Sequence, residues 1–308
     1  MEKEMSMPKI EQERLFGAGV DLFKSYYAVK FLHNILKNIG LREIKYDGFY
    51  QSLATYITSD EIAEIYDSIL PKKKREELAE SRNYRNPPEI GEDDTDDCLS
   101  YLGKNITRRK KMWDKLEEVY AVREKEFETR LNRKNRPFSA VEMRFLEMKE
   151  LFTLSQTEME ILLAIFFSAT SYLELGDFDP GRFHEDEKIS TLARMVGKLD
   201  VEVADLLNEK NNIGKFGLLD RDAELDSTFL SYLSGISSKV LSEKFWTKYT
   251  GEVLPWNFHG KLAEKHGAVL KRMIQAKTPE TGISVLLYGV AGSDKTSFAA
   301  SLAKDLGK

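Results

Sequence analysis

Apolar residues recur at helical spacing along the first part of the chain. In the stretch LFKSYYAVKFLHNIL, residues 22–36, they fall every three or four positions, and similar spacing extends from about Glu11 to Leu70. Gly40 and the pair Asp47-Gly48 interrupt the pattern, as turn residues do. The pattern predicts a mainly α protein in which residues 1–87 form an N-terminal helical region.

The segment NPPEIGEDDTDD, residues 86–97, interrupts this helical pattern. Six carboxylates fall between Glu89 and Asp97, directly after two prolines. Such a composition is typical of a solvated linker. Oxygen-rich loops also bind calcium, but the regular ligand spacing of a calcium loop is absent here. We therefore predict an acidic linker at residues 88–98.

A second helical region is predicted over residues 99–248. Its first helix runs roughly from Lys110 to Leu131 and places a row of apolar side chains on one face. Two later segments, SAVE at 139–142 and SQTE at 155–158, fit the capping box, in which a serine and a glutamate each bind the other's backbone N–H. The second box opens an apolar helix that runs through Phe167, and we expect this helix in the core.

Residues 155–235 follow the order of a winged helix-turn-helix domain. A short helix is expected from Ile189 to Met195, then a turn at Gly197, then a second helix with Asp200 as its N-cap. The segment GKFGLL, residues 214–219, predicts a strand after a tight turn. The sequence therefore predicts a winged-helix-like domain in this part of the chain.

The charge of that second helix argues against DNA recognition. Its acidic residues outnumber Lys210, which gives a local charge of about −3, and phosphate would repel such a helix. The acidic residues are Asp200, Glu202, Asp205 and Glu209. DNA recognition in the major groove remains one interpretation. We favour the other, a helical adaptor that packs against a neighbour, and expect no nucleic-acid partner.

Composition narrows the class of protein further. The chain has 308 residues, enough for about two domains, and its net charge of −5 provides no general attraction to nucleic acid or anionic membranes. Cys98 is the single cysteine, so no internal disulfide can form, which fits a reducing compartment. The longest apolar run, residues 161–167, is too short to span a membrane, and the N-terminus lacks the apolar core of a signal peptide. We expect a cytoplasmic protein without a membrane partner.

Near the end of the sequence, a glycine-rich turn lies between an apolar run and a helical segment. The run from Ser284 to Tyr288 suits a strand buried in a parallel sheet. The turn fits the pattern G-x-x-x-x-G-K-[ST] with one departure, because Asp294 replaces the second glycine. The candidate binding residues are Gly289, Val290, Ala291, Gly292, Ser293, Asp294, Lys295, Thr296 and Ser297.

Each position in this turn has a defined role in phosphate binding. The backbone amides of residues 291–296 would point at phosphate oxygens, helped by the N-terminus of the following helix. Lys295 would reach the β- and γ-phosphates, and the Thr296 hydroxyl would be a magnesium ligand. The alternative interpretation is an ordinary strand, turn and helix with a surface lysine.

The stretch VLLYGVAGSDKTSFAASLAKDLG, residues 285–307, resembles the Walker A region of AAA-type ATPases, which typically reads LLYGPPGTGKT. The preceding LPWNF, residues 254–258, resembles the linker that enters that module. The resemblance implies that residues 249–308 are this linker and the first strand, loop and helix of an α/β ATPase module. It also implies ATP and Mg²⁺ as cofactors, and a parent protein that couples ATP hydrolysis to the remodelling of a protein partner as a homo-oligomeric ring.

Two departures from the family limit these expectations. Asp294 adds a carboxylate where the family has glycine, so we expect weakened nucleotide binding. The family's Walker B acid, polar sensor and arginine finger lie downstream of the Walker A helix, so we expect no catalytic residue within residues 1–308 and interpret the sequence as a fragment. The alternatives are a non-hydrolysing adaptor or regulator with a vestigial phosphate loop, and a weak nucleic-acid-binding module.

Overall fold

The chain divides into two compact units, Met1–Leu241 and Ser242–Lys308, each of which is described by itself. The computed structural model describes residues 9–40, 44, 47–80, 87–88, 95–173, 175, 178, 180, 185–220, 222–236, 241, 250–276, 285–290 and 292–307.

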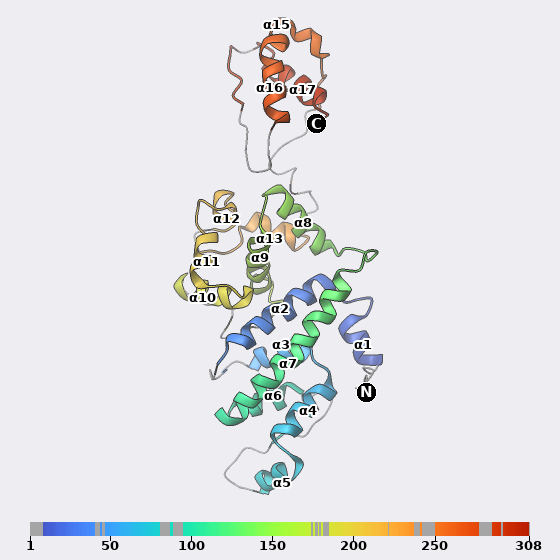
Figure 1. The fold of residues 1–308 in the computed structure, drawn as a ribbon, viewed down its shortest axis with the longest axis vertical. Coiled ribbons are helices and arrows are strands. Elements are labelled where there is room, and N and C mark those ends of the chain that lie inside the picture. Colours follow the sequence, from blue (N-terminus) through green and yellow to red (C-terminus); the bar gives the residue numbers. More distant parts are fainter. Residues whose placement is uncertain are drawn as a thin grey trace. The chain divides into compact units, whose positions relative to one another are not determined.

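The described part of the first unit consists of helices joined by short connections (Figure 1). These helices are α1 (Lys9–Phe16), α2 (Leu22–Asn38), α3 (Asp47–Thr55), α4 (Ser59–Ile69), α5 (Lys72–Glu80), α6 (Thr95–Gly103), α7 (Ile106–Leu131), α8 (Ala140–Leu151), α9 (Gln156–Ala169), α10 (Glu185–Val196), α11 (Asp200–Leu206), α12 (Asn212–Lys215) and α13 (Ser227–Leu233).

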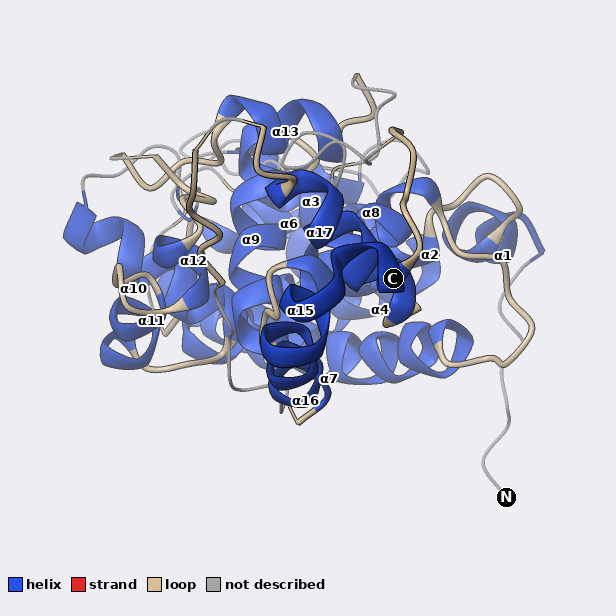
Figure 2. Cartoon of the chain, turned by 90° about the horizontal axis from the view of Figure 1, so that it is seen from above, coloured by secondary structure: helices blue, strands red, loops and turns tan. Residues whose placement is uncertain are grey.

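The second unit has shorter elements. They are a 3₁₀ turn η3 (Trp256–His259), α15 (Gly260–Leu262), a π-helical turn η4 (Ala263–Gly267), α16 (Ala268–Gln275) and α17 (Lys295–Asp305). The prediction of a mainly α protein is thus confirmed, and Figure 2 shows helices and loops throughout the described residues. None of these described helices is both long enough and apolar enough to cross a membrane.

A side-chain cap satisfies backbone N–H groups of the first turn at α2, α4, α7, α8, α9 and α13, whereas α11 and α12 begin without one. Ser155 and Glu158 form the complete capping box that the sequence predicts, with the Ser155 N–H 2.7 Å from Oε2 of Glu158. Thr58 and Glu61 form a second complete box at α4 that the sequence analysis missed. At α8 only half of the predicted box exists, because the Glu142 carboxylate pairs with Arg136 instead.

The predicted winged-helix-like domain is only partly correct. Helices α10 and α11 flank a turn at Gly197, as expected, although α11 begins at Asp200 itself and Leu199 occupies the cap position. The predicted strand at 214–219 is wrong, since residues 214 and 215 belong to α12 and the described residues retain one antiparallel bridge between Leu219 and Leu225. The reason is a tight turn: Oδ1 of Asp220 accepts hydrogen bonds from the N–H groups of Asp222 and Glu224, which closes the hairpin before a ladder can form.

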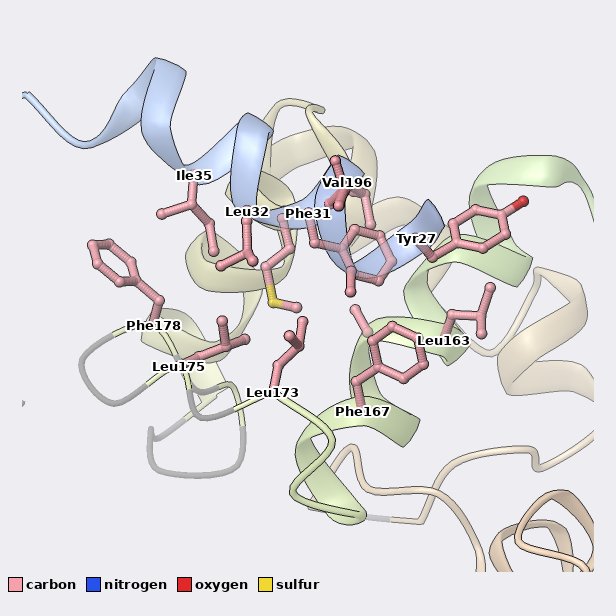
Figure 3. Close-up of a cluster of buried hydrophobic side chains, with 14 of the residues drawn as sticks. Tyr27, Phe31, Leu32, Ile35, Leu163, Phe167, Leu173, Leu175, Phe178 and Val196 are labelled. Atoms are coloured by element: carbon pink, nitrogen blue, oxygen red, sulfur yellow. The ribbon is translucent and has the colours of Figure 1, made fainter. Parts of the chain in front are cut away.

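The largest helix contact of the first unit joins α2 to α7, while α4 packs against both α6 and α7. Residues 89–94 of the predicted acidic linker at 88–98 lie outside the described residues, and the prediction is wrong for residues 95–98, because Thr95 starts α6 and Cys98 is buried in the core. Helices on both sides of the linker therefore belong to one unit. The core extends to α9 and α10, where Phe31, Phe167 and Val196 meet (Figure 3).

Helix α9 is the most completely buried element described. Every residue from Met159 to Phe167 is buried, which confirms its prediction as a core helix. The expected row on α7 is also confirmed for Trp113, Leu116, Tyr120 and Phe127, which are all buried, while Leu131 at the end of the row is only half-buried. A helix whose whole circumference is apolar or satisfied is stable only inside a protein. The first unit therefore has a true hydrophobic core.

One buried cation ties three helices of this core together. The Arg123 side chain on α7 is 2% exposed, and its Nη2 lies 2.8 Å from Oε2 of Glu61 on α4. Its Nε donates to the backbone oxygen of Tyr56, just after α3, at 3.0 Å. Its Nη1 pairs with Glu126 on its own helix. A buried guanidinium is tolerated because every group on it finds an acceptor.

Candidate functional site

The candidate site lies in the second unit, where the glycine-rich turn enters α17. A small aromatic cluster holds this helix: Phe298 is 2% exposed and its ring centroid lies 5.4 Å from those of both Trp256 and His259. The Ser301 hydroxyl donates to the backbone oxygen of Leu254 at 2.7 Å. The segment LPWNF thus anchors the helix that follows the turn. Sequence reasoning treated this segment only as a linker.

The backbone of the turn adopts conformations that glycine favours. Gly289 has φ +156°, and a Cβ placed there would lie 2.8 Å from the Ser293 hydroxyl oxygen. Gly292 has φ +80°. Asp294 has φ 50° and ψ 27°, which is the left-handed region, and Asp is among the few non-glycine residues that enter this region readily. The replacement of glycine by Asp294 is therefore compatible with the turn's backbone.

Lys295 is held close to the turn that it follows. Its ammonium nitrogen lies 2.7 Å from the oxygen of Val290, 3.1 Å from the oxygen of Gly289 and 3.1 Å from the hydroxyl of Ser293. The Ser293 hydroxyl in turn donates to the oxygen of Val290 at 2.8 Å. The three acceptors are all neutral, so an incoming anion can replace them without breaking an ion pair.

The N-terminus of α17 places backbone N–H groups beside this ammonium, and no side chain of the described residues caps them. The Asp294 side chain makes no capping hydrogen bond, and the first amide to join the helical pattern is that of Phe298, which donates to the Asp294 oxygen at 2.8 Å. The Thr296 side chain is exposed. The hydroxyl of Ser297 is buried and has no hydrogen-bond partner among the described residues. Amides at a helix N-terminus attract anions, and the orphaned Ser297 hydroxyl adds a polar group that an oxygen-rich ligand would satisfy.

The structure thus gathers Gly289, Val290, Gly292, Ser293 and the residues 294–297 around one helix end. Ala291 lies outside the described residues. The exposed carboxylate of Asp294 is the one feature that opposes an anion there. The described residues contain no cluster of three His, Cys, Asp or Glu side chains that would hold a metal by themselves. A magnesium ion at Thr296 would therefore have to bring phosphate oxygens or water as its remaining ligands.

The predicted strand before the turn is wrong for the described residues, since 285–289 form no strand and pair with no other segment. Ser284 lies outside the described residues. Val285 and Leu287 face an apolar groove of about 280 Å³ that is also lined by Leu270 and Ile274 of α16 and by Phe298 and Leu302 of α17. In contrast, Leu286 is 85% exposed and Tyr288 is 89% exposed. This alternation is that of a β-strand, but the part of the chain that the structure describes contains no second strand with which this backbone could form a ladder.

Comparison of the chain with protein-family models, curated proteins and solved structures found no match in any of the three. The site's geometry, together with the residues that form it, is therefore the basis for assigning a function.

Proposed function

We propose that the turn Gly289–Ser297 binds the phosphates of ATP together with Mg²⁺. The observation that carries this proposal is the position of the Lys295 ammonium, held on neutral oxygens of the turn beside the uncapped N-terminus of α17. A lysine and free helix amides at one point form a site that favours polyphosphate.

Different residues of the turn would bind the phosphates and the magnesium ion. Amides of the first turn of α17 would donate to phosphate oxygens, Lys295 would leave its three neutral acceptors for the β- and γ-phosphates, and the Thr296 hydroxyl would be a magnesium ligand. Bound magnesium would neutralise phosphate charge. By its resemblance to AAA-type ATPases, a parent protein would couple ATP hydrolysis to remodelling of a protein partner, as a homo-oligomeric ring.

Asp294 sets the expected strength of binding. Two unit charges about 4 Å apart interact by roughly 4 kcal/mol at an effective dielectric of 20. Because Asp294 is exposed, water and magnesium reduce this repulsion. We expect weak binding, not its complete loss.

Titration calorimetry of the chain with ATP and Mg²⁺ tests the proposal. Lys295→Ala should abolish measurable binding, whereas Lys304→Ala, an exposed lysine in the last turn of the same helix, should leave it unchanged. Asp294→Gly should strengthen binding by about tenfold or more, the equivalent of about 1.4 kcal/mol. The proposal would be contradicted if the Lys295→Ala variant still bound ATP, or if even the Asp294→Gly variant did not bind ATP.

The second candidate is a regulator or adaptor that binds nucleotide without hydrolysing it. The exposed Asp294 carboxylate in the phosphate loop favours this candidate, because it weakens the charge stabilisation that phosphoryl transfer requires. Phosphate release measured with saturating ATP tests this candidate. Release that Lys295→Ala abolishes would contradict the regulator and would also contradict the expectation that residues 1–308 hold no catalytic residue, whereas calorimetric binding without release agrees with both.

A further inference from the structure

A cavity of about 400 Å³ lies in the first unit, outside the phosphate loop. Its walls come from three segments that are distant in sequence: residues 14–25 at the junction of α1 and α2, residues 55 and 56 at the end of α3, and Tyr172 after α9. Ligand-binding pockets of proteins have volumes in this range and a few convergent polar groups among apolar walls. Leu15 and Val20 supply apolar wall here.

A cation without a carboxylate partner faces this cavity. The Lys24 ammonium lies 4.3 Å from the centroid of the Tyr172 ring, and no carboxylate of the described residues forms an ion pair with it. Lys30, on the same helix, is in contrast paired with Glu160. A cation's contact with an aromatic face at an accessible site is weak, so a charged oxygen would compete with it easily.

Two tyrosine hydroxyl groups lie at the same cavity. The Tyr56 hydroxyl donates to the Tyr172 oxygen at 3.4 Å. With its oxygen already an acceptor, Tyr172 has its own hydroxyl proton available for another group. Burial holds the pKa of Tyr56 well above its ordinary value, so this phenol stays neutral and keeps donating at physiological pH.

The other charged groups that line the cavity do not neutralise the Lys24 ammonium. The Arg14 guanidinium is occupied by the backbone oxygens of Thr55 and Ile57. One oxygen of Asp21 accepts the N–H of Lys24 and caps α2. Two cations and one carboxylate thus line the cavity, and the cation without a partner is the one on the tyrosine ring.

We infer that this cavity binds a small organic carboxylate. Its carboxylate oxygens would accept from the Lys24 ammonium and the Tyr172 hydroxyl, and its apolar body would contact Leu15 and Val20. This site is in a different unit from the phosphate loop, and it stands or falls independently of the ATP proposal.

Three probes of similar shape test the charge preference: benzoate, benzyl alcohol and benzylamine. Each is titrated into the full chain, and resonances of Lys24, Tyr56 and Tyr172 are followed by heteronuclear NMR. We expect benzoate to shift these resonances and to bind at least tenfold more tightly than benzyl alcohol, since charge-assisted hydrogen bonds are the strong ones. Tighter binding of benzylamine, or equal binding of all three, would overturn the inference.

Two variants and one control locate the binding. Lys24→Gln should weaken benzoate binding about tenfold or more, and Tyr172→Phe, which keeps the ring, should weaken it several-fold. Lys37→Gln, an exposed lysine at the other end of α2, should have no effect. Circular dichroism checks that each variant is folded. Unchanged benzoate affinity in folded Lys24→Gln would refute the site.

Discussion

The two units of the chain differ in how far their apolar side chains are buried. In the first unit, Phe31, Leu163 and Phe167 are 0% exposed in a continuous core. In the second unit, Leu286 and Tyr288 are 85% and 89% exposed, and the described buried apolar residues are Ala263, Phe298 and Leu302. The difference shows that an apolar sequence becomes buried only where its element finds a surface to cover it.

The physical reason lies in backbone hydrogen bonding. A helix satisfies its own N–H and C=O groups, so α9 needs only side-chain neighbours to be buried. The segment 285–289 would need a second strand to satisfy its backbone as a β-strand, and the described residues provide none. Four substitutions test this comparison, beginning with the largest expected effect.

Phe167→Ala should cause the largest loss. The side chain is fully buried on α9 and lies 5.9 Å, between ring centroids, from Phe31. Removing it should lower the free energy of unfolding by about 3–5 kcal/mol, through lost burial and a cavity. Urea unfolding followed by circular dichroism measures this loss. Val122→Ala, at a side chain that is 58% exposed, should change stability by less than about 0.5 kcal/mol. If both variants lost a similar free energy of unfolding, burial of side chains in this core would not be the source of the stability.

Arg123→Ala should cost less, about 2 kcal/mol, although Arg123 is also buried. Breaking a fully buried ion pair costs about 3–5 kcal/mol, but Glu61 and Glu126 are 32% and 40% exposed and can be hydrated again. The same unfolding measurement applies, with the exposed Lys125→Ala on α7 as control. If Arg123→Ala lowered the free energy of unfolding as much as Phe167→Ala does, hydrogen bonds and ion pairs between helices would stabilise the unit as much as packing does.

Glu124→Gln should have a smaller effect that depends on pH. Burial raises the pKa of Glu124, but the hydrogen bond and charge of His33 outweigh it and hold that pKa below its ordinary value. A carboxyl whose pKa is lowered by folding contributes stability above its unfolded pKa and loses it as the pH falls through the folded one. The variant should lose about 1 kcal/mol or less at neutral pH.

The check is the slope of unfolding free energy against pH in the acid range, which Glu124→Gln should flatten. Glu118→Gln is the matched control, since Glu118 is 67% exposed and pairs with Lys115 at the surface. If the slope of unfolding free energy against pH were unchanged in Glu124→Gln, the pair His33–Glu124 between α2 and α7 would not be a source of the acid sensitivity.

Leu286→Ser should have the smallest effect, less than about 0.5 kcal/mol, because the side chain is already in water. Hydrogen exchange of the amides of α17 reports on this unit directly. Leu302→Ala, at an 8% exposed position in the same unit, should increase that exchange clearly. If Leu286→Ser increased the exchange as much as Leu302→Ala, then the segment 285–289 would be packed, and the comparison of the two units would fail.

The sequence predicted the elements whose signals are local. The complete box at Ser155, the apolar helix through Phe167 and the buried row on α7 all follow from residues within a few positions of each other. The sequence also predicted the helix after the glycine-rich turn and the unusual backbone of that turn, because the pattern of glycines, Lys295 and Thr296 indicates both. The binding role assigned to the turn stays a prediction.

Only the tertiary structure decided how distant residues meet. The predicted strands failed, at 214–219 because Asp220 closes a tight turn and at 285–289 because a strand needs a partner. The salt bridge of Glu142 with Arg136, the burial of Arg123 and the cavity beside Lys24 and Tyr172 likewise have no local signal. Local hydrogen bonding and periodicity determine helices, whereas strand pairing, buried charge and cavities depend on contacts between segments far apart in the chain.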